Sequence, residues 1–408
     1  MDAAHQLDAD VVIFGGGCAG LWLLDELRWR GVRVLLLESG CLGAGQTASS
    51  QGILHGGLKY SLAGLLSSSA RMVREMPAAW EDAIAGRAEP NLSTVRSRAG
   101  WCYLWRGQSL KSWTAMLAAV TALQVGPVTL DEKHVPPVLA GCPRPIYRLD
   151  ERVIDPLSFL SVLAERNRGL IWQIEVSAGL SFDHGNTSSA CPAVIVRNPR
   201  DGTVARLQPA SIVLAAGEGN AALREQLGLP GQVMQRRPLR VALVRGELPR
   251  LNGHCVDGAK TRVTVTSDVD RAGRTVWQLG GQVSEDVVGL TPDEFLQLAQ
   301  RELAAVLPGW RGGRLEWAEF SVNRAERSTT DGLMPGDVQI LRDGPVLTVW
   351  PTKLVMAPLL SRRILDMLQV DRMNACDDWQ SSLQRHNWPA PSTSPPPWER
   401  ELSWVSIG

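Results

Sequence analysis

The sequence has 408 residues, a formal net charge of zero and 44% hydrophobic residues, so it is long enough for two domains with a sizeable core. A chain without net charge gives no indication of a nucleic-acid partner or of an acidic membrane surface. No apolar run approaches the roughly 18 residues that span a bilayer, and the N-terminus lacks the basic and apolar segments of a signal peptide. The seven cysteines are odd in number and contain no CxxC pair, so neither a metal site nor a disulfide framework is expected, and the reducing cytoplasm is indicated.

The first 39 residues are predicted to form a βαβ unit. Residues 10–14 (DVVIF) are typical of a buried strand, residues 21–31 carry a helical apolar stripe, and residues 32–39 form a second strand. Four glycines lie between the first strand and the helix, and three of them, Gly15, Gly17 and Gly20, have the spacing G-x-G-x-x-G. An acid ends the second strand, 18 residues after Gly20.

This combination of glycines and an acid is typical of a dinucleotide site. Gly15 permits a tight turn, Gly17 lets a pyrophosphate approach the backbone and the helix N-terminus, and Gly20 lets helix and strand pack closely. The carboxylate of Glu38 accepts hydrogen bonds from ribose hydroxyls, and a glycine-rich turn of another α/β fold would not explain this acid. The sequence therefore predicts dinucleotide binding by Gly15, Gly17, Cys18, Ala19, Gly20, Glu38 and Ser39.

The next segment, residues 43–60 (GAGQTASSQGILHGGLKY), resembles the FAD-dependent D-amino-acid oxidase superfamily. This superfamily includes glycine and sarcosine oxidases, 2-hydroxyglutarate dehydrogenases and flavin-linked glycerol-3-phosphate dehydrogenases, and the glycerol-phosphate branch carries a very similar S-S-x-x-x-I-H-G-G run. Residues 151–163, 211–220 and 346–365 resemble three later segments of the superfamily: the one with the "grvdP" pattern, the second flavin strand, and the last strand and helix. The resemblance is thinner in the part of the chain that would bind the substrate.

The resemblance implies a glutathione-reductase-type fold with non-covalently bound FAD. One loop would wrap the pyrophosphate and the ribityl chain, and the turn after the last strand would face the flavin ring. The cofactor-binding residues implied in addition to the glycine turn are Thr47, Ala48, Ser49, Ser50, Gln51, Gly52, Val176, Ala215, Ala216, Gly217, Thr352, Lys353 and Leu354.

The expected fold is an α/β FAD-binding Rossmann-type domain interleaved with an α+β substrate domain that contains an antiparallel sheet. In the substrate domain, residues 238–248, 261–268 and 275–283 alternate like strands, and residues 291–307 are predicted to form a helix with Pro292 at its first position.

The domain boundaries follow from the superfamily pattern. The tail is rich in proline and tryptophan, and because disordered segments generally lack tryptophan, it is expected to dock as a strap. The expected FAD-binding domain comprises 1–60, 148–225 and 325–370, the substrate domain 61–147 and 226–324, and the strap 371–408.

His55 and Lys59 are candidates for the active site. They are four residues apart, so in a helix they share one face, and the resemblance directs that face toward the flavin ring, because the equivalent histidine of the resembling dehydrogenases lies at the active site. The alternative for His55 is a structural role in its loop. Lys59 either contacts an anionic substrate or is solvated.

Three further cations are candidates. Only five of the 42 basic residues are lysines, and one of them, Lys353, is expected to begin the final helix in the turn that the superfamily places beside the flavin. A cation there stabilises the negative charge of the reduced ring; the alternative is a surface lysine. Arg324 and Arg327 are candidates for binding a substrate carboxylate through both oxygens, although residues 323–335 depart from the superfamily's spacing.

The implied activity is removal of a hydride from a small amine, amino acid or hydroxy acid by the flavin, with oxygen or another electron acceptor. A hydroxy substrate is favoured by His55, because alcohols benefit from a base. One alternative is an NADPH-dependent flavin monooxygenase or halogenase, in which residues 217–222 (GEGNAA) would form a second nucleotide site. The other is a non-catalytic flavin-binding protein. The expected partner is a small-molecule substrate, without nucleic acid and without an integral membrane segment.

Overall fold

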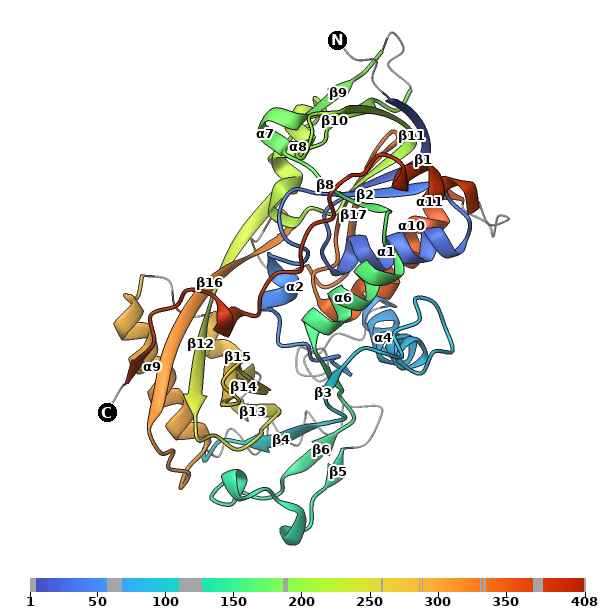
Figure 1. The fold of residues 1–408 in the computed structure, drawn as a ribbon. Helices are drawn as coiled ribbons and strands as arrows, with labels where there is room; N and C mark the ends of the chain where they lie inside the picture. The colour runs from blue at the N-terminus through green and yellow to red at the C-terminus, as the bar shows by residue number, and fades with distance from the viewer. Residues whose placement is uncertain are drawn as a thin grey trace.

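The computed structural model describes residues 5–56, 68–109, 127–185, 190–257, 260–285, 287, 289–330, 332, 335–369 and 377–406. Two large sheets organise these residues, and helices cover the first sheet and one side of the second (Figure 1). Parallel strands dominate the first sheet and antiparallel strands the second, so the predicted fold class is confirmed. In the described part of the chain, no helix combines the length and the apolar character needed to cross a membrane.

The first sheet has the strand order β17-β18-β11-β1-β2-β8, with β10 and β9 added beside β11. β1 is parallel to both β2 and β11, as the βαβ prediction requires, and β18 is parallel to β11. The strands are β1 (His5–Phe14), β2 (Val34–Glu38), β8 (Ile171–Gln173), β9 (Leu180–Asp183), β10 (Ala193–Arg197), β11 (Val204–Leu214), β17 (Gln339–Asp343) and β18 (Val346–Trp350).

The central strands of this sheet are continuous apolar runs, as is typical of strands that are buried on both faces. Four of the five residues of β2 are buried, as are the last four of β1. Helix α1 packs against α6 and α10, and α10 packs against α4. The helices near this sheet are α1 (Cys18–Trp29), α2 (Gln46–Ser49), α4 (Ser68–Ile84), α6 (Pro156–Arg166), α7 (Val176–Gly179), α8 (Asn220–Gln226), α10 (Ala357–Leu368) and α11 (Asp377–Gln384).

The second sheet has nine strands in the order β19-β16-β12-β15-β14-β13-β4-β6-β5. Its longest pair, β12 and β16, runs antiparallel from Met234↔Arg327 to Gly246↔Leu315. The strands are β4 (Cys102–Arg106), β5 (Val128–Thr129), β6 (Tyr147–Leu149), β12 (Met234–Gly246), β13 (Gly253–Asp257), β14 (Lys260–Val269), β15 (Thr275–Gly280), β16 (Leu315–Arg327) and β19 (Val405–Ser406).

Helix α9 (Pro292–Val306) packs on this second sheet, with Phe295, Ala299 and Leu303 buried. Its predicted start is confirmed, because Thr291 is the N-cap and forms a capping box with Glu294. A small third sheet pairs β3 (Ser97–Ala99) with β7 (Val153–Ile154) between the two large ones.

Along the chain, groups of consecutive strands belong in turn to the first and to the second large sheet, as an interleaved arrangement of two domains requires. Strand β6 extends across the expected boundary at 147/148, and β16 continues three residues past the expected boundary at 324. The division into domains remains a prediction.

The C-terminal segment, residues 377–406, connects the two large sheets (Figure 1). Trp388 stacks on Trp172 of β8, with ring centroids 4.1 Å apart and an interplanar angle of 2°. Farther along, Trp398 is buried and lies against Arg98, and β19 adds to the edge of β16. This segment therefore packs as an extended strap across both sheets.

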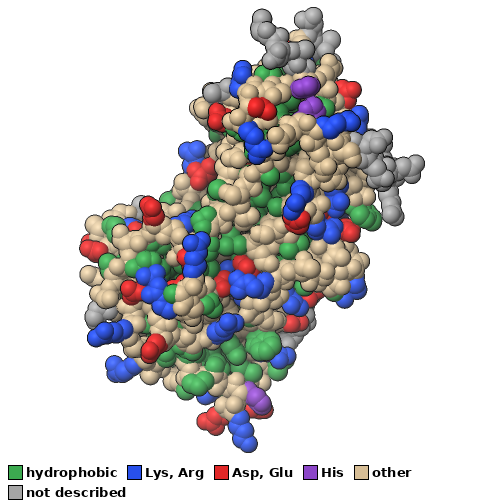
Figure 2. Space-filling view, viewed as in Figure 1, with side chains coloured by type: hydrophobic (Ala, Val, Ile, Leu, Met, Phe, Trp, Pro, Cys, Tyr) green, Lys and Arg blue, Asp and Glu red, His purple; other side chains and the backbone are tan. Residues whose placement is uncertain are grey.

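The surface carries charges of both signs. On the face shown in Figure 2, Lys and Arg side chains lie interspersed with Asp and Glu side chains, in keeping with the zero net charge. The described surface thus gives no support to a nucleic-acid interface on this face.

Candidate active site

The glycine turn between β1 and α1 is closed against the end of β11. Gly15 has a φ of 104°, a conformation that L side chains rarely adopt, and a Cβ at this position would lie 2.6 Å from the Ala215 carbonyl oxygen and from Ala216 Cα. A Cβ on Gly20 would overlap the carbonyl oxygen of Gly15. At both positions a side chain would therefore overlap neighbouring backbone atoms, which is why glycine is needed there.

The N-terminus of α1 is open to a ligand. Gly17 is the N-cap and provides no side-chain hydrogen bond to the helix. The Cys18 N–H donates to Thr47 Oγ1 at 3.0 Å, and burial raises the pKa of the Cys18 thiol, so it stays protonated. A helix N-terminus lined by glycine is suited to phosphate oxygens.

The acid at the end of β2 lies beside this turn. Glu38 Oε2 accepts from Gly16 N at 2.6 Å, and its Oε1 accepts from Gly40 N at 2.8 Å. The carboxylate is thereby held next to the turn, where a dinucleotide presents its ribose hydroxyls. Ser39 follows it as an exposed residue.

The loop after α2 joins the first sheet to the second. Gln51 Nε2 donates to Gln278 O at 2.9 Å, while Gln278 Nε2 donates to Ser49 O at 2.7 Å. Gly52 has a φ of 74°, and a Cβ there would overlap the Ile154 carbonyl oxygen. Glycine is therefore required at position 52 because the backbone of Ile154 approaches it closely. The expected reason was the approach of a flavin ring.

Several buried polar atoms in the described residues lack a hydrogen-bond partner, and three of them belong to this region. Ser50 Oγ lies in the loop after α2. Gln278 Oε1 belongs to the side chain whose Nε2 donates to Ser49 O, and Trp350 Nε1 belongs to the last residue of β18. Buried polar groups nearly always have a partner. Unpartnered buried polar atoms, together with the glycine turn and the acid, fit a polar, phosphate-bearing cofactor such as FAD.

The predicted residues after β11 flank the same turn, whereas Val176, after β8, lies on a helix that contacts β10. Ala215 N donates to Phe14 O at 2.8 Å, and Ala216 N donates to Asn220 Oδ1 at 2.9 Å. Gly217 has a φ of 58°, and space is open where its Cβ would point. Val176 begins the short helix α7.

The turn after β18 contains a strained residue. Thr352 has a φ of 62° and donates to Met356 Sδ at 3.2 Å. Lys353 N donates to Pro351 O at 2.7 Å, and the residue caps a short 3₁₀-helix, Leu354–Met356. The expectation that Lys353 begins the final helix is thus wrong by one turn, since α10 starts at Ala357. A non-glycine residue held in the left-handed region costs about 1–3 kcal/mol and is typical of ligand-binding turns.

His55 lies in a buried cluster with two residues that the sequence did not single out. Glu151 Oε2 is 3.0 Å from His254 Nε2 and 3.7 Å from His55 Nδ1, and the two imidazole rings are 5.5 Å apart. Gly56 N donates to Glu151 Oε1 at 2.8 Å. The side chains of Glu151 and His254 are only 3% and 1% exposed, so this is a buried carboxylate with a hydrogen-bond partner at each oxygen.

The electrostatics of the cluster favour an ionised carboxylate. Burial by itself raises the pKa of Glu151, but the hydrogen bonds and positive charges of His254 and His55 outweigh it, and the pKa of Glu151 is held well below its usual range. Neither Glu151 nor His254 has a spacing motif that would have revealed them. Lys59, expected beside His55, lies outside the described residues.

The two candidate arginines do not form one clamp. Arg324 and Arg327 both lie on β16, three positions apart, so their side chains leave opposite faces of the strand. Arg324 Nη1 is 3.1 Å from Glu285 Oε1. At most one of them can therefore face a given ligand.

One residue of the strap reaches the loop that follows the glycine turn. Arg400 has both Nη atoms 3.5 Å from Ser49 Oγ, and burial lowers the pKa of its guanidinium. It lines a hollow of about 240 Å³ with Gly45, Ser49, Glu218 and Asn323. The sequence had placed no site residue in the tail.

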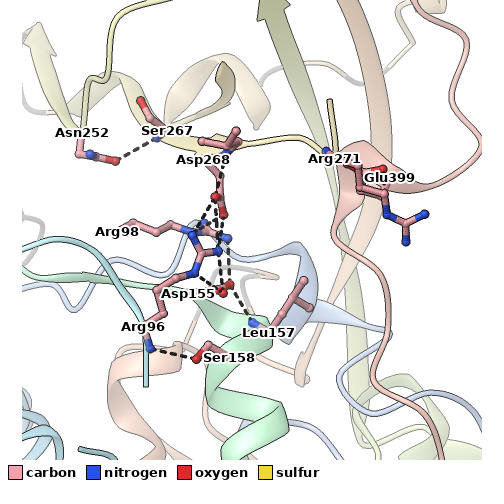
Figure 3. A network of polar contacts seen from close by, with 11 residues as sticks. Arg96, Arg98, Asp155, Leu157, Ser158, Asn252, Ser267, Asp268, Arg271 and Glu399 are labelled. Carbon is pink, nitrogen blue, oxygen red and sulfur yellow. Dashed lines mark hydrogen bonds and ion pairs between the residues drawn. The ribbon is translucent and has the colours of Figure 1, made fainter. Parts of the chain in front are cut away.

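A network of ion pairs joins Arg96 and Arg98 to Asp155 and Asp268 (Figure 3). Arg98 is 3.3 Å from Asp155 Oδ1 and 2.7 Å from Asp268 Oδ2, and Arg96 Nη2 donates to Asp155 Oδ2 at 2.8 Å. Asp155 begins α6, whereas Asp268 belongs to β14 of the second sheet. The network thus links the start of α6 to the second sheet.

The fold and the site together define an oxidoreductase of the type that binds a flavin dinucleotide. The chain matches the family described as FAD dependent oxidoreductase over residues 10–347, and it belongs to this family. A probable FAD-dependent oxidoreductase of Pseudomonas aeruginosa is 35% identical over 401 residues, covering 97% of this chain and 98% of the relative. The family, the FAD cofactor and the enzymatic nature predicted from the sequence are therefore confirmed.

Solved structures agree on the fold. The crystal structure of the FAD-dependent oxidoreductase from Pseudomonas aeruginosa covers 98% of this chain and 99% of its own, with a TM-score of 0.78 and 32% identity. Glycine oxidase from Geobacillus kaustophilus has a TM-score of 0.61 at 16% identity, covering 90% and 96%. L-α-Glycerophosphate oxidase from Mycoplasma pneumoniae, with FAD bound, has a TM-score of 0.63 at 14% identity, covering 95% and 99%.

Proposed function

We propose that this enzyme oxidises a small polar metabolite at a carbon that bears a hydroxyl or an amine, with a hydroxy acid or a related anionic alcohol as the favoured class. The observation that carries the proposal is the position of His55, whose Nδ1 faces the ionised Glu151 while the ring remains partly exposed. A histidine held in this way is suited to accept the proton of a hydroxyl group.

The residues that would hold the FAD are those of the glycine turn and its surroundings. The backbone at Gly17, where α1 begins, would meet the pyrophosphate, and Glu38 would meet the ribose. Ser50 and Trp350 offer unpartnered polar atoms to the rest of the cofactor. When bound without a covalent bond, FAD supplies the two-electron acceptor that takes the hydride.

The other residues of the site act on the substrate and on charge. His55 takes the substrate proton, and Lys353, in the strained turn after β18, stabilises negative charge that develops on the flavin side of the site. An arginine on one face of β16 or Lys59 would contact a substrate anion. Oxygen or another acceptor would then take the electrons from the reduced flavin. The cytoplasmic location expected from the cysteines stays a prediction.

Similarity to enzymes of small polar substrates supports this proposal. A stretch of 62 residues is 37% identical to part of the anaerobic glycerol-3-phosphate dehydrogenase of Escherichia coli, covering 15% of this chain and 11% of that polypeptide. The glycine oxidase and the glycerophosphate oxidase share the fold.

The test is anaerobic bleaching of the flavin by matched pairs of compounds that differ only in hydroxyl or amine, such as lactate with alanine and glycolate with glycine. We expect bleaching by one or more hydroxy compounds, and loss of about 10²–10⁴-fold in its rate in His55→Asn. Bleaching by NADPH alone would contradict the proposal and favour a monooxygenase. Bleaching only by amines, with His55→Asn unaffected, would remove the histidine from the mechanism.

A further inference from the structure

Arg400, in the C-terminal strap, is a half-buried cation that forms no ion pair with any described residue. Both of its Nη atoms lie 3.5 Å from Ser49 Oγ, at the outer limit of a hydrogen bond. Burial lowers the pKa of its guanidinium, and no carboxylate of the described chain acts against this shift. The neighbouring acid of the strap, Glu399, accepts from Arg271 N at 2.7 Å instead. A guanidinium stays charged and carries five N–H donors, so Arg400 can offer donors to a ligand.

The guanidinium lines a small hollow between three parts of the chain. Its polar and glycine lining consists of Arg400 of the strap, Gly45 and Ser49 at α2, Ser321 and Asn323 of β16, and Glu218. A Cβ on Gly45 would have no atom within 4 Å, so the hollow is open at this point. The volume of about 240 Å³ lies below the roughly 300–1,000 Å³ of pockets for drug-sized ligands, so the hollow suits a small molecule.

The hollow has an excess of positive charge. Glu218 is the one acid among the described residues that line it. Its Oε2 lies 3.2 Å from Arg236 Nε and accepts from Asn323 Nδ2 at 3.3 Å. Arg236 does not line the hollow, so the carboxylate is compensated from outside it, whereas the charge of Arg400 is not compensated. An anion that enters the hollow therefore meets an attractive cation.

The hollow faces away from the glycine turn. Thr47 Oγ1 accepts from Cys18 N, at the start of α1, so the side of α2 that carries Thr47 faces the turn. Residues two positions apart on a helix do not share a face, and Gly45 and Ser49 are each two positions from Thr47. They lie on the side of α2 that is turned toward the strap and β16. The hollow is thus distinct from the phosphate site at the N-terminus of α1.

We propose that this hollow is a binding site for a small oxyanion, a carboxylate or a phosphate group, with Arg400 as its principal contact and the hydroxyl groups of Ser49 and Ser321 beside it. A guanidinium binds two oxygens of such a group at once. The bound anion would connect the strap to α2 and to the second sheet, and it would thereby stabilise the docked strap. The site is independent of the substrate class proposed above, because no residue of the His55 cluster lines it.

The test measures anion binding to the FAD-loaded enzyme by isothermal titration calorimetry. Inorganic phosphate, acetate and malonate are the probes, titrated separately at an ionic strength held constant with sodium chloride. We expect saturable binding of at least one probe, and the preferred probe distinguishes a phosphate site from a carboxylate site. Arg400→Gln should weaken this binding at least about 10-fold, because hydrogen bonds between two charged groups are lost.

Two further variants make the test specific. Glu218→Gln keeps the size of the side chain and removes the negative charge, so it should tighten anion binding by about 2–5-fold. This variant also decides the question if Arg400→Gln fails to fold. Arg271→Gln is the matched control, because this arginine also contacts the strap, through Glu399, but is 81% exposed and lies outside the hollow. The affinity for the anion should not change in this control.

The outcomes separate the anion site from the alternatives. Equal affinity in the wild type and Arg400→Gln, unchanged affinity in Glu218→Gln, or binding of none of the three probes overturns the proposal. Anion binding to the apoprotein that disappears when FAD is added overturns it as well, because Arg400 would then meet the phosphates of the cofactor. None of these results depends on which compounds bleach the flavin, so this proposal and the proposed function can fail independently.

Discussion

Glu151 Oε2 lies 3.0 Å from His254 Nε2, although 103 residues separate them along the chain. Both side chains are buried, and their contact joins the segment before β7 to β13 of the second sheet. Because the same oxygen faces His55, the contact connects the stability of the interface to the protonation of the site.

The first prediction concerns stability and pH. The pKa of Glu151 is lowered in the folded state, so its ionised form contributes stability above its unfolded pKa of about 4.3, and this contribution is lost as the pH falls. Glu151→Gln should therefore reduce the free energy of unfolding by about 1–3 kcal/mol at pH 7, and by less at pH 4. Urea unfolding with excess FAD at both pH values measures this. If Glu151→Gln loses more free energy of unfolding at pH 4 than at pH 7, the predicted pH dependence is wrong.

The second prediction contrasts two glycines of the turn. A Cβ on Gly17 would lie 3.4 Å from Thr47 Oγ1, whereas one on Gly20 would overlap the backbone of Gly15. Gly17→Ala should fold with nearly wild-type stability as apoprotein but bind FAD at least about 10-fold more weakly, because the methyl group occupies the approach of the pyrophosphate. Gly20→Ala should lower the melting temperature of the apoprotein. Thermal unfolding and FAD titration check both, and unchanged FAD affinity in Gly17→Ala would contradict the phosphate site.

The third prediction concerns Lys353. Its replacement by methionine keeps the length of the side chain and removes the charge, so flavin reduction should slow by about 10–100-fold while FAD stays bound. Lys133→Met is the control, because this lysine is exposed in a 3₁₀-helix far along the chain from the glycine turn. Stopped-flow absorbance under anaerobic conditions measures the rate. Equal rates in the two variants would place Lys353 outside the mechanism.

The fourth prediction concerns the ion-pair network of Figure 3. Arg98 and Asp268 are 4% and 5% exposed, and removing one partner of a buried pair typically costs about 3–5 kcal/mol because the other charge is left uncompensated. Arg98→Leu should therefore destabilise the protein far more than Arg87→Leu, whose pair with Asp82 is largely exposed and contributes about 0–1 kcal/mol. Chemical unfolding of both variants measures the difference, and equal losses would count against a stabilising link between the sheets.

The sequence by itself determined the cofactor half of this protein. The βαβ unit, its glycines and its acid are contiguous, and each depends on backbone sterics that act within about 25 residues, so their positions could be predicted without knowing the rest of the fold. The capping box of α9 is local in the same way, and Thr291 begins that helix as expected.

Only the tertiary structure decided which side chains face His55. Glu151 and His254 lie on different elements, and their contact depends on how β13 is placed against the segment that carries Gly56, which no spacing in the sequence encodes. The strain at Thr352 and the opposite faces of Arg324 and Arg327 were likewise settled by packing and strand register. Local propensity acts over a few residues, whereas the electrostatic environment of a buried group is set by whichever distant residues the fold brings within a few ångströms of it.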